Sequence, residues 1–586
     1  MLSIVMRFMA RIDTCKKYGI LLLFSIINLL YMHYYFLYRQ LFEGDLFVYS
    51  IFFNIVSVCF DVFVLLLFFM LVTWKHIRAS LLLTYIVTLV WAFVNIVYGD
   101  FFDQYLSVSS LTQAGNMFDG LVISSIMADI DYHHMYFVFS LLIFIFVYHK
   151  LGHFPLDKNF YRLSIYYPFL SLVIFFSTYS IYHFINPKTK NNTQLYFGRI
   201  KDYIYVGGSE KNAGPNKLRF HVGCVRYLLS DLYEYYNPKV LTEEELHEIK
   251  EIINDSNGQT SNNPDNPNLK NVVVILLESF LSLSSDLIVD NKRITPFLDS
   301  LKHSEDVYYN GHVKSNITIG ESGDGQFIYM TGLLPCRHKI TIGEVNNHTY
   351  PALPKILKKE FGIKYAEIVI PTNPKIWMQD KMNVVYGIDN MYCTKDYTQE
   401  ENGTLTDEQV FDMASKTNKV KNGPFFSMIL SVSTHQPYND MIDKAFVIND
   451  DSMSKSFRAY LNACHYVDKQ LKIYFDHLKQ IRQYENTLIC ILADHQPNMD
   501  ALESGGGLSS ELPFYVVNGG PELVSSYDGP CNQLDVYTTI LDLLNIYSEW
   551  KGLGRSLLSP NYKDMVDTEM YRISELIIEG DYFGNK

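Results

Sequence analysis

The feature that most constrains this chain is a series of long apolar segments confined to its first third. Most of them approach the ~20 residues that a membrane-spanning helix requires, although the fourth is short. The sequence therefore predicts an all-α transmembrane domain over residues 1–186. Five spanning helices are expected, at residues 18–38, 46–73, 80–98, 134–149 and 163–186.

The basic residues indicate how these segments are oriented. Lysines and arginines precede the first segment and lie between the second and third and between the fourth and fifth. The connection from Gly99 to Met135 contains several aspartates and no lysine or arginine. Because basic connections stay in the cytoplasm, we expect a cytoplasmic N-terminus. Five crossings then place the chain after residue 186 outside a cell (inner) membrane, in the periplasm or at the cell surface, and the first segment is an uncleaved anchor.

Asp61 lies inside the second apolar segment. A charged group in hydrocarbon is costly and often marks a functional site. The simpler interpretation is that Asp61 faces the interior of the helix bundle or lies near the end of an overlong segment. We favour the simpler one.

The acidic character of the chain is confined to its second part. Residues 1–186 contain as many acidic as basic side chains, so the net charge of −13 lies in residues 187–586. A nucleic-acid-binding protein needs a basic surface, so this function is not expected. The eight cysteines form no CxxC pair, and the sequence leaves open whether Cys336 and Cys393 are joined by a disulfide.

Residues 187–268 are expected to form a helical connector outside the membrane. Val225–Tyr236 has helical spacing, and Leu241–Ile249 is typical of a capped helix, with Thr242 as its N-cap and acidic residues in its first turn. The stretch Asn254–Asn268 is rich in Asn, Asp, Ser, Gly and Pro, which indicates a linker.

From residue 269 to residue 586, strand-like runs alternate with helical patterns. This alternation predicts an α/β domain with a mainly parallel sheet. The expected strands are Val272–Leu277, Tyr365–Ile370, Phe425–Val432, Thr487–Leu492 and Pro513–Val517, and helices are expected at Tyr350–Phe361, Phe457–Leu478 and Leu534–Ile546.

Acids and imidazoles follow three of the expected strands. Glu278, His435 and the pair Asp494–His495 come at strand ends, and ligands of open α/β sheets bind at that edge. Ser322 lies between glycines where a helical pattern begins, and a helix N-terminus favours an anion. Each residue alone is more simply explained as a cap or a loop residue. Together they predict a site for one divalent metal, Mn²⁺ in preference to Zn²⁺, bound by the residues Glu278, Ser322, Asp494 and His495.

At these residues the chain resembles the alkaline phosphatase superfamily, and specifically the lipoteichoic acid synthase branch of the sulfatase-like membrane enzymes. The resemblance rests on Val274–Phe280, Gly320–Phe327, Ser433–Tyr438 and Leu492–His495. It implies an alkaline phosphatase-like (sulfatase) domain after the membrane helices. It also implies that Ser322 is the nucleophile, where the family usually has threonine, and that His435 lies beside the transferred phosphate.

The chain departs from the family in the segment that binds the head group. Trp377 is present, but Ile370 and Gln379 stand where the family has a histidine and an arginine. Trp377, Gln379 and His435 are the expected substrate-binding residues. Because the planar guanidinium clamp is missing, phosphoglycerol does not follow from the resemblance. Leu333–Arg337 has leucine where a formylglycine sulfatase needs cysteine or serine, which argues against that chemistry.

These observations predict a membrane-anchored, metal-dependent transferase. It would move a phosphoglycerol-like or phosphoethanolamine-like head group from a membrane phospholipid, through a covalent phospho-Ser322 intermediate, to an envelope glycan or lipid acceptor. Two alternatives remain open. One is an extracytoplasmic phosphodiesterase or sulfuric ester hydrolase, and the other is an inactive metal-binding scaffold or sensor for envelope assembly.

Overall fold

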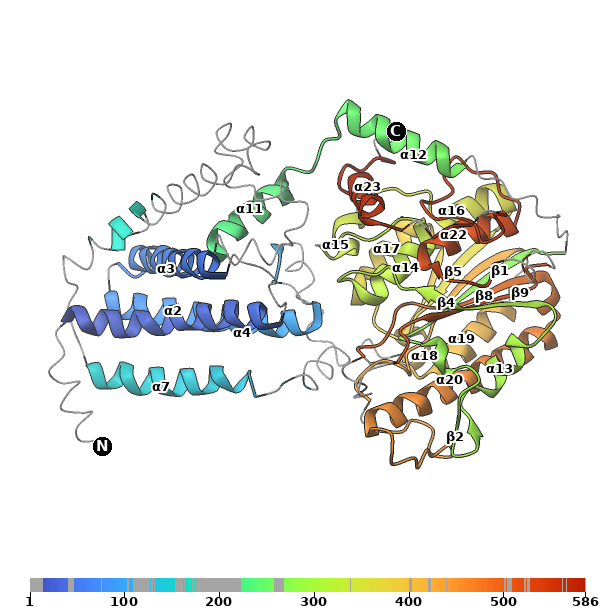
Figure 1. The fold of residues 1–586 in the computed structure, drawn as a ribbon, viewed down its shortest axis with the longest axis horizontal. Helices are drawn as coiled ribbons and strands as arrows, with labels where there is room; N and C mark the ends of the chain where they lie inside the picture. Colours follow the sequence, from blue (N-terminus) through green and yellow to red (C-terminus); the bar gives the residue numbers. More distant parts are fainter. Residues whose placement is uncertain are drawn as a thin grey trace. The chain divides into compact units, whose positions relative to one another are not determined.

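The computed structural model describes residues 14–39, 47–102, 132–152, 223–257 and 268–584, with short gaps, and isolated positions between residues 105 and 173. The chain forms two compact units (Figure 1). The first comprises Met1–Leu111 and Asp129–Pro238, and the second comprises Thr112–Ala128 and Lys239–Lys586. The domain limits expected at residues 186 and 268 stay predictions.

Apolar helices dominate the described part of the first unit. Three of them are long and apolar enough to cross a membrane, and the fourth is apolar but shorter. They are α2 (Thr14–Arg39), α3 (Phe47–Val72), α4 (Ile77–Phe102) and the shorter α7 (Met135–Leu151). The chain is therefore a membrane protein. The expected fifth segment, residues 163–186, lies largely outside the described residues, so the number of crossings stays a prediction.

Aromatic rings and buried hydrogen bonds hold this bundle together. Tyr85 of α4 stacks on Phe144 of α7 with ring centroids 3.5 Å apart, and Phe24 of α2 contacts both rings edge-on. The hydroxyl of Ser140 in α7 donates to the Asn28 side chain of α2 at 3.1 Å. Polar side chains inside an apolar bundle fix which faces of the helices meet, because an unpaired polar group in such a bundle is costly.

Asp61 is fully buried, and it binds the start of another helix. Its carboxylate accepts the backbone N–H groups of Cys224 at 2.5 Å and Val225 at 3.1 Å, the first residues of α11 (Cys224–Tyr236). A side chain on Gly223, which has φ 83°, would place its Cβ 2.7 Å from Asp61 Oδ2. Asp61 therefore faces the interior of the unit and satisfies two N–H groups of α11, where a negative charge is also favoured by the helix dipole.

The second unit is built on an eight-stranded sheet of order β10-β4-β9-β8-β1-β7-β5-β6. Only β9 runs antiparallel to its neighbours, which confirms the mainly parallel α/β prediction. The strands are β1 (Asn271–Leu277), β4 (Val307–Lys314), β5 (Tyr365–Val369), β6 (Asn390–Tyr392), β7 (Phe425–Leu430), β8 (Thr487–Ala493), β9 (Leu512–Val517) and β10 (Cys531–Asn532), and β2 (Ile288–Val289) and β3 (Lys292–Arg293) form a separate hairpin.

Helices cover both faces of this sheet (Figure 1). Every residue of β1 and β8 is consequently buried, as a continuous apolar run predicts. One group consists of α13 (Pro296–Lys302), α19 (Asp407–Lys419) and α20 (Lys455–Gln480). The other includes α14 (Glu321–Thr331), α16 (Leu353–Ile356), α17 (Gln379–Tyr386), α22 (Gln533–Leu543) and α23 (Thr568–Glu579). Short helices α15 (Thr341–Val345) and α18 (Thr394–Thr398) complete the unit.

The two helices of the expected connector belong to different units. The division falls after Pro238, so α11 groups with the membrane helices and α12 (Glu243–Asn257) with the sheet unit. Thr242 is the predicted N-cap: its hydroxyl accepts the Glu245 N–H at 3.3 Å, and the Glu245 carboxylate accepts the Thr242 N–H at 2.9 Å. An ion pair between Arg572 and Glu248 joins α23 to α12. Cys336 and Cys393 are both buried free thiols.

Replacing Asp61 by alanine is expected to loosen α11. Two buried N–H groups would lose their acceptor, at a cost of about 1–3 kcal/mol. Amide hydrogen exchange over residues 224–236 of the full chain in detergent should accelerate roughly 10- to 100-fold.

Asp61→Asn retains one acceptor oxygen and should have a smaller effect. Exchange in α12, which belongs to the other unit, serves as the internal control and should not change. Unaltered protection of α11 in Asp61→Ala would show that this carboxylate does not hold the helix.

Candidate active site

Two neighbouring strands deliver the acidic residues of the site. Glu278 directly follows β1, and Asp494 and His495 directly follow β8. The two strands pair in parallel, with Leu277 opposite Ala493. The next residues, Glu278 and Asp494, therefore leave the sheet side by side at its carboxyl edge, as the sequence predicts.

A close approach of α14 to the end of β8 brings Ser322 to the same place. A Cβ on Gly325 would lie 2.3 Å from the carbonyl oxygen of Asp494, so only glycine permits this packing. The Tyr329 hydroxyl donates to the Ala493 carbonyl oxygen at 2.8 Å and fixes the helix along its length. Ser322 is the second residue of α14 and thus lies over the strand ends.

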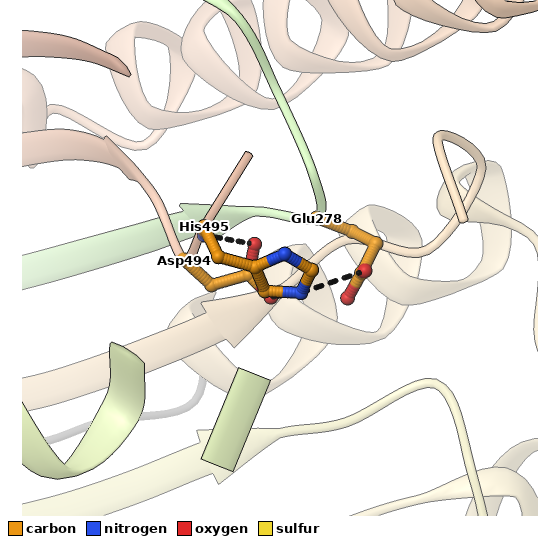
Figure 2. A group of neighbouring side chains, drawn as sticks. All are labelled: Glu278, Asp494 and His495. Atoms are coloured by element: carbon orange, nitrogen blue, oxygen red, sulfur yellow. Dashed lines mark hydrogen bonds and ion pairs between the residues drawn. The ribbon is translucent and has the colours of Figure 1, made fainter. Parts of the chain in front are cut away.

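The four expected ligands converge. The Ser322 hydroxyl donates to Glu278 Oε2 at 3.2 Å and lies 3.1 Å from His495 Nε2. His495 Nε2 is 3.5 Å from Glu278 Oε1 and 3.7 Å from Asp494 Oδ2 (Figure 2). One donor atom from each of Glu278, Asp494 and His495 lies within 4.8 Å of the others. Donors that each lie ~2.0–2.3 Å from one ion have separations of this size, so these residues could hold a divalent metal.

Hydrogen bonds around the site orient the donor atoms. His495 Nδ1 lies 2.6 Å from the Gln496 carbonyl oxygen, which leaves Nε2 facing the carboxylates. Asp494 Oδ1 accepts the N–H groups of Ser279 and His495, both at 2.8 Å, and leaves Oδ2 toward the imidazole. The Ser279 hydroxyl donates to Glu278 Oε1 at 2.8 Å. Such supporting contacts fix ligand geometry in metal sites.

The segment after β7 carries His435 and is bonded to the backbone of Glu278. The Glu278 N–H donates to Ser431 Oγ at 2.9 Å, and the Thr434 hydroxyl donates to the Glu278 carbonyl oxygen. The charge of His435 also helps to lower the pKa of Glu278. His435 therefore belongs to the same site.

Buried charges crowd this edge of the sheet. Burial and the neighbouring Glu278 charge raise the pKa of Asp494. Burial opposes the charged form of Glu278, but its hydrogen bond to His495 and the charges of His435 and His495 hold its pKa well below the usual range. Burial also opposes a charged His495, but the charges of Asp494 and Glu278 raise its pKa well above the usual range. The two carboxylates thus favour positive charge between them, which a divalent cation would supply.

Of the residues expected to bind the head group, Trp377 lies next to the nucleophile segment, whereas Gln379 is bonded inside its own helix. A Cβ on Gly323 would lie 3.3 Å from Trp377 Cε3, so the tryptophan ring lies against the residue next to Ser322. Trp377 and Met378 both have left-handed backbones, φ 51° and 48°, which cost roughly 1–2 kcal/mol per residue and are typical of functional sites. Gln379 instead is buried, and its amide donates to Asn383 Oδ1 at 3.0 Å within α17.

Sequence reasoning missed Ser279 and Asp324. Asp324 is buried, and its Oδ2 accepts hydrogen bonds from Thr318 N, Thr318 Oγ1 and Gly320 N at 2.9–3.0 Å. It thereby fixes the turn before Ser322. A carboxylate in the first turn of a helix is the signal that could have identified Asp324.

The sequence of this chain resembles a protein family and individual relatives. Residues 270–546 match the sulfatase family. The chain is 24% identical over 524 residues to a lipoteichoic acid synthase of Staphylococcus aureus, covering 84% of this chain and 76% of the relative. The lipoteichoic acid synthase of Staphylococcus saprophyticus is 24% identical over 506 residues, covering 81% and 74%.

A solved membrane protein shares the fold. The lipooligosaccharide phosphoethanolamine transferase A of Neisseria meningitidis matches with a TM-score of 0.55 at 13% identity, covering 93% of this chain and 97% of that one. The match extends over the membrane helices as well as the sheet unit, because it covers almost all of both chains.

Replacing Gly325 by alanine is expected to separate α14 from β8. The added methyl group would meet backbone atoms, so the unfolding free energy should fall by about 1–3 kcal/mol and Ser322 should move from the carboxylates. Thermal unfolding of the full chain measures the first effect. Gly323→Ala is the matched comparison, because its Cβ would meet side chains at 3.3–3.5 Å and should be better tolerated.

Replacing Asp494 by asparagine is expected to weaken metal binding by more than the 10- to 100-fold that is typical for loss of a supporting contact. Metal content after dialysis, measured by mass spectrometry, should be about one divalent ion in the wild type and far lower in the variant. His312→Ala alters an exposed histidine on β4 and should retain the metal. Full occupancy in Asp494→Asn would rule out this ligand.

Proposed function

We propose that this chain, a lipoteichoic acid synthase-like member of the sulfatase and alkaline phosphatase superfamily, is a membrane-anchored phosphotransferase. It moves a phosphoglycerol-like or phosphoethanolamine-like head group from a membrane phospholipid to an envelope glycan or lipid acceptor. The observation that carries this proposal is the Ser322 hydroxyl, which lies within hydrogen-bonding reach of both Glu278 and His495.

The resident metal is proposed to be Mn²⁺, with Zn²⁺ as the alternative, because the donor set is hard and mixed in oxygen and nitrogen. Glu278, Asp494, His495 and Ser322 would hold it. When bound, such an ion lowers the pKa of a coordinated hydroxyl and offsets the negative charge of a phosphoryl group.

In the first step, Ser322 Oγ attacks the phosphorus of the donor lipid in line. The Oγ–P bond forms while the bond from phosphorus to the diacylglycerol oxygen breaks. Ser322 releases its proton to solvent, and His435 gives a proton to the departing oxygen. The N-terminus of α14, where Ser322 lies, favours the negative charge that develops on the phosphoryl oxygens.

In the second step, an acceptor hydroxyl replaces Ser322 on phosphorus. The acceptor gives its proton to His435 as its oxygen bonds to phosphorus, and Ser322 Oγ leaves and is protonated again. The head group is thereby transferred as an intact phosphodiester. Trp377 is proposed to contact the head group during both steps, which its packing beside Gly323 supports.

The membrane unit is proposed to hold the lipid donor near the site and so raise its effective concentration. This arrangement requires the catalytic unit to lie outside the cytoplasm, as the distribution of basic residues predicts. A sulfuric ester hydrolase is disfavoured by Leu333, which cannot be converted to formylglycine. An inactive scaffold is disfavoured by the complete ligand set and the intact hydroxyl.

Replacing Ser322 by alanine is expected to reduce head-group transfer by at least about 1,000-fold, because the nucleophile is lost. Peptide mass spectrometry on the full chain after incubation with phospholipid vesicles should find a phosphodiester adduct on Ser322 in the wild type only.

Ser322→Thr is the matched control, because it keeps a hydroxyl of the kind that the family uses. It should retain the adduct and measurable turnover. Undiminished transfer by Ser322→Ala would contradict the assignment of the nucleophile.

A further inference from the structure

Asp407 is a buried aspartate that the steps above do not use. It is the first residue of α19, and its exposed fraction is 0%. Its Oδ1 accepts the backbone N–H of Val432 at 2.8 Å, and its Oδ2 accepts that of Ser433 at 3.1 Å. The carboxylate therefore binds the chain just after β7, in the segment that leads to His435.

The start of α19 does not need this carboxylate as a cap. The Gln409 side chain accepts the Thr406 N–H at 2.9 Å, and the Thr406 hydroxyl accepts the Gln409 N–H at 3.4 Å, so a capping box already closes the first turn. A buried carboxylate is costly unless hydrogen bonds replace its lost water. Asp407 obtains these bonds from the segment after β7 and not from its own helix, so its role concerns that segment.

Two consecutive contacts link Asp407 to His435. Asp407 holds the N–H of Val432, and the carbonyl oxygen of Val432 accepts the His435 N–H at 2.9 Å. Glu278 holds the same turn through two further hydrogen bonds, between its backbone and hydroxyl groups of the turn. The turn that carries His435 is therefore held both by a residue of the charged cluster and by Asp407.

The imidazole at the end of this turn has one nitrogen for proton exchange. His435 Nδ1 is hydrogen-bonded to the Gln436 carbonyl oxygen. A carbonyl oxygen only accepts, so Nδ1 carries a proton and the exchange in the proposed steps falls to Nε2. The side chain of His435 is partly exposed, so the position of Nε2 depends strongly on the backbone of the turn.

We propose that Asp407 is a positioning residue, which holds Val432 and Ser433 so that His435 Nε2 can give a proton to the departing lipid oxygen. A displacement of about 1 Å can cost roughly 100-fold in rate, and general acid catalysis contributes roughly 100- to 10,000-fold. The effect of Asp407 should therefore be confined to steps that need this proton. This inference rests on the proposed transferase function and adds a residue to it.

The test compares two donors that differ in their leaving group. The first is phospholipid in vesicles of equal parts phosphatidylethanolamine and phosphatidylglycerol, whose diacylglycerol oxygen needs a proton as it leaves. The second is an equal mixture of the 4-nitrophenyl esters of phosphoethanolamine and phosphoglycerol, whose 4-nitrophenolate leaves as a stable anion. Mass spectrometry measures how fast the full chain, loaded with Mn²⁺, forms the adduct on Ser322 from each donor.

Asp407→Ala should slow adduct formation from the phospholipid about 100-fold and from the nitrophenyl esters less than about threefold. Asp407→Asn keeps one acceptor oxygen and should lie between the wild type and Asp407→Ala. In His435→Ala the acid is already lost, so adding Asp407→Ala should slow the phospholipid reaction by less than about threefold more.

Asp468→Ala is the matched control. Asp468 is 1% exposed, and its carboxylate also accepts two consecutive backbone N–H groups, those of Phe297 at 2.9 Å and Leu298 at 2.7 Å. These contacts join α20 to α13 and not to the turn of His435. Loss of Asp468 should lower the unfolding temperature as loss of Asp407 does, but any slowing should be equal for the two donors.

Equal slowing of both donors in Asp407→Ala, or losses that add up in the double variant, would overturn this inference and leave the transferase function intact. An undiminished phospholipid reaction in Asp407→Ala or in His435→Ala would do the same. The double variant is measured with phospholipid alone, so it decides the question even where the esters react poorly. Absence of the Ser322 adduct in the wild type and in Ser322→Thr would contradict the transferase function, and this inference with it.

Discussion

The site depends on the parallel pairing of β1 with β8. This pairing brings two carboxylates and an imidazole out of the sheet side by side, although more than 200 residues separate them in the sequence. Negative groups buried this closely raise one another's free energy, and either a proton or a positive charge between them relieves the repulsion. The backbone N–H groups that fix Asp494 and the serine that contacts Glu278 are arranged around this requirement.

Backbone proximity then determines which side chain meets the charged cluster. The glycine at position 325 allows α14 to touch the end of β8, and Asp324 fixes the turn that precedes the helix. The hydroxyl of Ser322, on the second residue of that helix, lies at the positive end of the helix dipole and contacts Glu278 and His495. Ser279 and Glu321, the chain neighbours of Glu278 and Ser322, have left-handed backbones, as do Trp377 and Met378. Strained backbones of this kind occur often at functional sites.

In the membrane unit, too, a buried carboxylate needs compensating partners, but there the partners are backbone N–H groups. Asp61 is a buried carboxylate inside an apolar helix, yet it is satisfied by two backbone N–H groups at the start of α11. A buried charge next to a helix N-terminus can serve structure alone. At the sheet edge, in contrast, the carboxylates face one another and an imidazole, and this is the arrangement that can bind an ion.

The sequence alone determined the apolar helices that the structure describes and the mainly parallel sheet, because these follow from long apolar runs and from apolar strands buried on both faces. Short motifs at strand ends also indicated that Glu278, Ser322, Asp494 and His495 lie together, as the structure shows, while their role as metal ligands stays a prediction. The polar, bulged strand β4 and the very short β6 and β10 escaped prediction, since their pairing depends on partners far along the chain. Only the tertiary structure decided that Gln379 is bonded within its own helix, that Asp61 holds α11, and that Asp324 fixes the turn before Ser322. Each of these depends on which side chains meet across the fold, and spacing along one chain carries no record of that.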